Sequence, residues 1–236
     1  MRVPSTLPVI IMSFLQPFVQ ASIPSENIPT LAACRAKLEM YERHVIEQLA
    51  VLLYLESWAP SSIPLDRTQQ WRDDVQKYDS TFSHRLASTL TQFVDKNNVH
   101  FSGSTSTLED VCGARARVGI DVAQAKFSSD PMAYRTFASR GDSATILALI
   151  TNEAVEAAIL ARVRSSARDF VGTLGASTGN DAESINDFSK MVELFFKEIL
   201  IPLTKDLEVS VLLQLSLEPA NEVHEKDFKS SVHDFQ

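Results

Sequence analysis

Helix-breaking residues are scarce over most of this chain. Its 236 residues include only 7 glycines, none before Gly103, and proline is missing from 65–130 and from 132–201. Because glycine and proline interrupt helices, these long uninterrupted stretches, rich in Ala, Leu, Glu and Ser, predict helices. No run alternates between apolar and polar residues as a half-buried strand does. The sequence therefore predicts an all-α protein, and its length suits one domain with a substantial core.

Residues that bind metals or act as nucleophiles are also few. The 2 cysteines and 5 histidines lack the spacing of a metal site, and no Ser/His/Asp set stands out. The segment GTLGASTGN at 172–180 lacks the Lys-Ser/Thr ending of a phosphate-binding loop and follows an expected helix, so it is interpreted as a connector. We expect no metal and no cofactor. The net charge of −8 argues against nucleic acid and anionic membranes as partners.

The first 21 residues differ from the rest. Arg2 precedes the apolar run LPVIIMSFLQPFV, and Val19-Gln20-Ala21 then supplies small or β-branched residues at the positions before a cleavage site. This pattern predicts a secretory signal peptide at 1–21, although a buried N-terminal segment is the alternative. The expected mature chain, 22–236, is a single soluble, exported domain with a frayed tail at 218–236. In an exported chain, two cysteines favour a disulfide, here between Cys34 and Cys112.

Capping residues and breakers divide the remainder into helices. Asp66, Asp142 and either Thr151 or Asn152 are suitable N-caps, and Pro202 should kink the last helix. The expected helices cover about 30–57, 66–77, 80–96, 107–128, 131–139, 142–150, 152–171 and 181–217.

Polar residues occur on helix faces that are otherwise apolar. At the i, i+4, i+7, i+11 spacing of one face, positions 115, 119, 122 and 126 read Arg, Gly, Val and Lys. Three other expected helices show the same feature. A single such residue is usually a helix-edge residue reaching water, but four helices with this feature predict a charge-lined pocket, because buried charge needs a partner or a ligand. The excess of cations indicates an anionic ligand. The residues concerned are Arg35, Arg115, Lys126, Asn152, Glu156, Thr204 and Glu208.

Several segments resemble a known family. The stretch 125–163, with its TNEAVE, and FFKEILIPLTKDLEVSVLLQ at 195–214 are similar to the eukaryotic, yeast-type AroQ chorismate mutases. RARVGIDVAQAK at 115–126 resembles the long catalytic helix of that family, and CRAKLEMYERHVI at 34–46 resembles its first helix. The resemblance implies a bundle of long, kinked helices, a homodimer, and conversion of chorismate to prephenate without a cofactor.

The resemblance also implies roles for the seven polar residues. Arg35 and Arg115 match arginines that bind the substrate carboxylates, and Lys126 matches a lysine that reaches the ether oxygen. Asn152 and Glu156 match the pair that orients the substrate. Two further matches complete the set: Thr204 corresponds to a contact of a carboxylate and Glu208 to the glutamate facing the ether oxygen.

The chain departs from the yeast-type pattern at two places. It begins with an export signal, and the segment between Arg35 and Arg115 is shorter than the one that helps to bind aromatic amino-acid effectors in that family. The combination is similar to the secreted chorismate mutases of plant-associated fungi, which implies a fungal effector that is secreted, is delivered into host cells and drains host chorismate. The alternative is a catalytically silent secreted protein that binds a host protein on the same helical scaffold.

Overall fold

The computed structural model describes residues 29–54, 70–178 and 182–218. Within these ranges the secondary structure is helical throughout, as the scarcity of glycine and proline predicts. The elements are α1 (Leu31–Tyr54), α2 (Gln70–Gln76), α3 (Phe82–Asn97), α4 (Ser106–Ser129), α5 (Pro131–Ala138), α6 (Ser143–Ile150), α7 (Glu153–Thr178), α8 (Ala182–Phe195), the π-helical turn η3 (Phe196–Leu200) and α9 (Ile201–Leu217).

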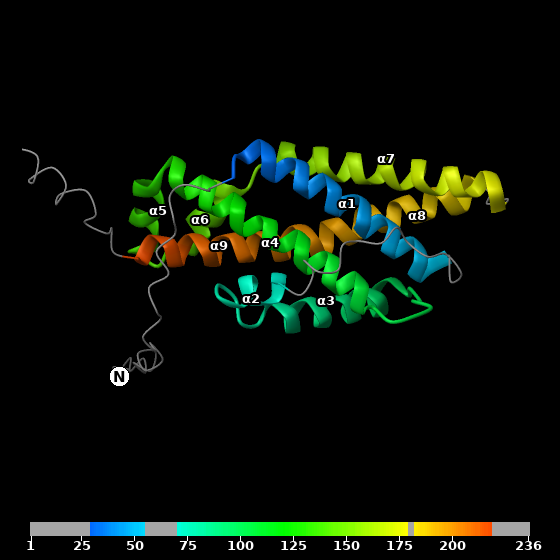
Figure 1. Cartoon of the computed structure of the whole chain (residues 1–236), viewed down its shortest axis with the longest axis horizontal. Helices are drawn as coiled ribbons and strands as arrows, with labels where there is room; N and C mark the ends of the chain where they lie inside the picture. The colour runs from blue at the N-terminus through cyan, green and yellow to red at the C-terminus, as the bar shows by residue number, and fades with distance from the viewer. Residues whose placement is uncertain (1–28, 55–69, 179–181, 219–236) are drawn as a thin grey trace, which may run out of the picture.

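The helices form an elongated bundle around α4. This helix packs against α1 on one side and α9 on the other, while α7 packs against α8 and α1. In Figure 1, α1 and α7 lie along one side of the α4–α9 pair, α2 and α3 lie along the opposite side, and α5 and α6 cover one end. The α4 residues on both sides are therefore enclosed, and twelve of the 24 residues of the helix are buried.

Three of the helix starts have polar caps, and two of these caps, Asp142 and Asn152, are predicted by the sequence. Asp130 Oδ1 accepts a hydrogen bond from Ala133 N at 3.1 Å, and Asp142 Oδ1 accepts one from Thr145 N at 2.9 Å. Asn152 Oδ1 accepts from Val155 N at 3.1 Å, so Asn152 rather than Thr151 caps α7. These bonds satisfy amide groups that a helix N-terminus leaves without an intrahelical partner. The expected cap Asp66 lies outside the described residues.

Two expectations about the later helices need correction or refinement. Residues 172–178 continue α7, so most of the segment interpreted as a connector is helical. The last long helix contains the π-turn Phe196–Leu200 immediately before Pro202, and Ile201 N donates to the Phe196 carbonyl. A π-turn accommodates a residue that cannot donate a backbone hydrogen bond, so the chain passes Pro202 without leaving the bundle.

Membrane-spanning potential is limited in the described ranges. No single helix there is long and apolar enough to cross a membrane, although the pair Ser143–Ile150 and Glu153–Thr173, bent by 56°, passes the same test of length and composition. The proposed signal peptide and nearly all of the expected frayed tail lie outside the described residues.

Candidate functional site

Arg115 is a buried cation in the middle of α4, with only 3% of its surface exposed. Its Nη1 donates to Thr204 Oγ1 at 3.2 Å, its Nη2 lies 3.6 Å from Glu42 Oε1, and its guanidinium lies 5.4 Å from the centre of the Phe196 ring. Burial lowers the pKa of Arg115, and Glu42 opposes that shift. Arg115 Nε and Glu42 Oε1 have no hydrogen-bond partner among the described residues, so this buried pair has unused capacity to bind a ligand.

Lys126, almost three turns further along α4, faces a buried carboxyl group. Its Nζ lies 2.8 Å from Glu208 Oε2 on α9. Burial raises the pKa of Glu208, while Lys126 most strongly, then Arg115 and Lys205, act to lower it. The charged form of a desolvated carboxyl is disfavoured, so Glu208 depends on these cations to stay ionised.

Two more ion pairs extend the site to α7. Lys205 Nζ lies 2.5 Å from Glu156 Oε1. Arg162 forms a two-nitrogen contact with Glu42, in which Nε and Nη2 lie 3.0 and 2.8 Å from Oε2. Glu42 therefore lies between Arg162 and Arg115 and links α1, α4 and α7 through charged groups.

We call these charged groups the pocket cluster. It contains four cations and three carboxylates and lies where α1, α4, α7 and α9 meet. Its members are Glu42, Arg115, Lys126, Glu156, Arg162, Lys205 and Glu208. Glu39, exposed on α1, also contacts Arg162 at 3.3 Å, so with every group ionised the cluster and Glu39 together are neutral, and with Glu208 neutral they carry a charge of +1. Such a site favours an anion that can replace the internal carboxylates as partners of the cations.

The Thr204 hydroxyl joins the cluster to the backbone of α9. Its Oγ1 donates to the Leu200 carbonyl at 2.7 Å and accepts from Arg115 Nη1. In this structure Thr204 thus holds Arg115 rather than offering a free donor. Its position beside the guanidinium agrees with the sequence prediction that both belong to one site.

Arg35 and Asn152 are less enclosed than the sequence predicted. Arg35 is exposed and has no hydrogen-bond or ion-pair partner in the described ranges. It shares a face of α1 with Glu42, seven residues on, so it stands at the outer end of the stripe that leads into the site. Asn152 is exposed and its side chain caps α7. Substrate binding by these two residues remains a prediction.

The expected disulfide is wrong for this structure. Cys34 and Cys112 are both free and buried. Cys34 lies within electrostatic range of Asp121, and its neighbour Lys37 lies 3.5 Å from the Asp121 carboxylate. Asp121 is nine residues beyond Cys112 on α4, which is about 13 Å of helix. Disulfides need Cα atoms within about 7 Å, so the antiparallel packing of α1 on α4 keeps the two thiols apart.

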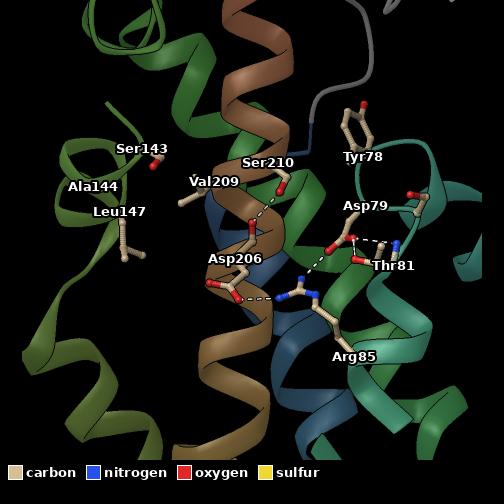
Figure 2. Close-up of a pocket in the computed structure, with 11 residues that line it drawn as sticks. Tyr78, Asp79, Thr81, Arg85, Ser143, Ala144, Leu147, Asp206, Val209 and Ser210 are labelled. Atoms are coloured by element: carbon tan, nitrogen blue, oxygen red, sulfur yellow. Dashed lines mark hydrogen bonds and ion pairs between the residues drawn. The ribbon is translucent and has the colours of Figure 1, made fainter. Parts of the chain in front are cut away.

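Two hollows lie away from the pocket cluster. One of about 660 Å³ is lined from the α2–α3 turn, α3, α6 and α9, and Figure 2 shows Arg85 between Asp79 and Asp206, bonded to Asp206 at 2.7 Å. The other, of about 610 Å³, lies between α7 and α8 beside Arg164 and Glu193. Neither is lined by a member of the pocket cluster, whose cations are closed onto its own carboxylates.

Sequence reasoning missed Glu42, Arg162 and Lys205. Glu42 lay on the same apolar stripe as Arg35 and could have been found there. Arg162 and Lys205 each lie one residue from a predicted position on the stripe, so periodicity alone excluded them. Their long side chains reach back to the site from the edge of the helix.

No three His, Cys, Asp or Glu side chains within 29–54, 70–178 and 182–218 converge as a metal ion would require.

Several known proteins are similar to this chain in sequence. No model of a known protein family matches the sequence. The chain is 35% identical over 124 residues to a chorismate mutase of Saccharomyces cerevisiae, covering 51% of this chain and 46% of that enzyme. It is 32% identical over 123 residues to a chorismate mutase of Trichoderma parareesei, with 48% and 43% covered. To the chloroplastic chorismate mutase 3 of Arabidopsis thaliana it is 32% identical over 142 residues, with 56% and 43% covered. The chain therefore spans less than half the length of each of these curated relatives.

Solved structures show the same architecture. The chorismate mutase of Candida albicans, in complex with L-Trp, superimposes with a TM-score of 0.53 and 21% identity over 84% of this chain and 96% of that one. The chloroplast enzyme of Zea mays gives a TM-score of 0.50 and 18% identity, over 82% and 98%. At these identities the superpositions establish the fold alone. This chain is thus similar in sequence to eukaryotic chorismate mutases over about half of its length, and it shares an all-helical fold with two solved structures.

Proposed function

We propose that this protein is a chorismate mutase that converts chorismate to prephenate. One observation supports this most strongly: half-buried Lys126 and buried Glu208 lie 2.8 Å apart, close enough to Arg115 for the guanidinium to affect the pKa of Glu208. These three groups are what the reaction requires, and they occur in a chain with 35% identity to a yeast chorismate mutase over 124 residues.

The reaction is a concerted rearrangement that needs no nucleophile, metal or cofactor. Its substrate is a flexible dianion that must be held as a chair, with the enolpyruvyl arm folded over the ring. Cations that grip its two carboxylates impose this near-attack geometry. The pocket cluster supplies these cations, and protonation of Glu208 removes one of the internal carboxylates that compete with the substrate for them.

Charge development explains the pairing of Lys126 with Glu208. As the ether C–O bond breaks, negative charge grows on the oxygen, and fixed donors aimed at that atom lower the barrier. When Lys126 turns from Glu208 to the substrate, Glu208 loses its closest cation while a dianion approaches. Both changes favour protonation of a carboxyl whose pKa burial already raises. Glu208 then donates a hydrogen bond instead of repelling the developing charge.

The other predicted residues complete the substrate site. Arg115 binds one substrate carboxylate, and Thr204 holds its guanidinium in place through the 3.2 Å hydrogen bond. Arg35 closes over the second carboxylate from the outer end of its α1 stripe. Glu156 and Asn152 at the start of α7 orient the ring of the substrate.

We propose further that the enzyme is exported, is an effector delivered into host tissue, and forms a homodimer. The signal-like sequence of residues 1–21 supports export. The effector role follows from export together with the reaction, since removal of host chorismate would limit defence compounds made from it. The dimer rests on the family resemblance, and light scattering of the purified protein would test it directly.

Identification of the product tests the proposed function. The purified protein should convert chorismate to prephenate, detected by proton NMR as new resonances that grow as those of chorismate decline. A heat-denatured sample provides the uncatalysed rate. Chorismate that declines no faster than in that control would reject the proposal and favour the silent, host-binding alternative.

A further inference from the structure

Gly119 lies one turn beyond Arg115, on the face of α4 that carries both Arg115 and Lys126. A Cβ atom at this position would lie 2.9 Å from Thr204 Cγ2 and 3.5 Å from Glu208 Cγ. Non-bonded carbon atoms pack about 3.5–4.0 Å apart. The methyl group of Thr204 therefore occupies space that the Cβ of any other residue would need.

The backbone at Gly119 gives no other reason for glycine. It lies in the interior of a regular α-helix, and the described glycine with a positive φ angle is Gly141 instead. Glycine weakens a helix interior relative to alanine. The reason for glycine at position 119 is thus that α9 packs closely against α4 there.

The position of the Thr204 methyl group also determines the direction of its hydroxyl. Both groups are attached to the same β-carbon, so a methyl group held against Gly119 selects one side-chain rotamer. In that rotamer the hydroxyl donates to the Leu200 carbonyl at 2.7 Å and accepts from Arg115 at 3.2 Å. The contact between the Thr204 methyl group and Gly119 therefore also fixes the hydroxyl group in the direction that accepts a hydrogen bond from Arg115.

We propose that Gly119 is a positioning residue, whose missing side chain forms a notch that orients the Thr204 hydroxyl group toward Arg115. Its effect on turnover rests on the proposed function, whereas the notch itself does not. The contact also suggests a matched compensating change, because Thr204→Ser removes the methyl group nearest to the added Cβ and keeps the hydroxyl.

Four proteins test the inference: wild type, Gly119→Ala, Thr204→Ser and the double variant. In the protein that keeps Thr204, Gly119→Ala should lower kcat/KM by about tenfold or more, because displacing a site residue by about 1 Å can reduce the rate by that much. In the Thr204→Ser background the same change should cost no more than about threefold, since the atom in closest contact is gone. Gly172→Ala is the control, because Gly172 is exposed and has no atom near its Cβ position.

Equal costs of Gly119→Ala in both backgrounds would overturn the proposal, as would a single variant that keeps wild-type activity. If the single variant does not fold, the comparison of Thr204→Ser with the double variant still decides, because the proposal requires them to be nearly equal. The melting temperatures of the same proteins separate this inference from the proposed function. Without substrate, Gly119→Ala should lower Tm by about 2–4 °C or more, and Thr204→Ser should remove most of that decrease.

Discussion

Glu208 combines two properties that oppose one another in the free protein. Burial raises its pKa above the ordinary value of 4.5, while the 2.8 Å contact with Lys126 favours its ionised form. In the proposed reaction, the dianionic substrate engages Lys126 and adds negative charge near Glu208, so both changes favour the neutral acid. If the neutral acid is the catalytic form, activity should be full below the pKa of Glu208 in the complex and should fall as pH rises through it.

Replacement of Glu208 by glutamine isolates this titration. Glu208→Gln keeps a hydrogen-bond donor that cannot ionise, so the variant should retain its rate to higher pH even if its maximum is lower. The measurement is kcat/KM against pH for both proteins. A wild-type profile flat from about pH 5 to about 8.5, or an identical alkaline decrease in the variant, would mean that Glu208 stays ionised and simply pairs with Lys126.

For single residues, the sequence predicted which side chains lie together better than it predicted how far each one is buried. Arg115, Lys126, Thr204 and Glu208 lie together because α4 and α9 are covered along these positions. The same periodic argument failed for Arg35, which lies in the first turns of α1 where the face is open to solvent. A pattern of spacing identifies a face of a helix, but it does not say how far along the helix that face is covered.

Packing between elements depends on close approaches that the sequence does not reveal. Gly113 on α4 lies against the ring of Trp71 on α2, and a Cβ there would come within 2.4–2.5 Å of three ring atoms. Trp71 is 2% exposed, and its indole nitrogen contacts Asp110 at 3.4 Å. The indole therefore fills a space that a side chain at position 113 would close.

Gly113→Ala should destabilise the protein through this contact. Overpacking of a rigid ring costs about 1–3 kcal/mol, which exceeds the gain in helix propensity of up to about 1 kcal/mol. Urea denaturation followed by circular dichroism measures the difference in free energy of unfolding. Gly172→Ala is the matched control and should leave stability unchanged or raise it slightly. If both variants unfolded at the same urea concentration, Trp71 would have to be mobile enough to move aside.

The failed disulfide prediction has its cause at the same scale. Sequence reasoning paired Cys34 with Cys112 because two cysteines in an exported chain favour a disulfide, without knowledge of how their helices pack. The structure packs α1 antiparallel to α4, so that Cys34 meets Asp121 while Ser102 N, near the start of α4, donates to the Leu52 carbonyl near the end of α1. Relative register between two helices depends on side-chain packing along their whole length, which helical periodicity does not determine.

In the whole molecule, the pocket cluster lies at the meeting point of four helices, and the larger hollow lies on the opposite face of α9. Asp206, which lines that hollow, lies between Lys205 and Glu208 in the sequence but points to Arg85 of α3. The all-helical class was predictable because breakers are scarce over the whole chain. The assembly of the site was predictable only in part, because ion pairs such as Glu42 with Arg162 cross between helices.

Aromatic amino acids should have little effect on turnover. The Candida albicans structure contains L-Trp, and it shares the fold of this chain. The resemblance to yeast-type enzymes, however, leads us to expect that the segment between Arg35 and Arg115 is shorter than the one that helps to bind effectors in that family. Saturating tryptophan or tyrosine should therefore leave apparent substrate affinity unchanged. A shift of several-fold in KM with either amino acid would show that an effector site is retained.

The most direct measurement is the rate at which chorismate absorbance disappears with wild-type protein and with Lys126→Ala, purified in the same way. Wild type should show saturable turnover. Loss of one preorganised donor to developing charge is worth roughly 3 kcal/mol, so kcat of the variant should fall by about 10² or more with its helical circular dichroism intact. A wild-type rate equal to the uncatalysed rate, or a folded Lys126→Ala variant as active as wild type, would contradict catalysis by the pocket cluster.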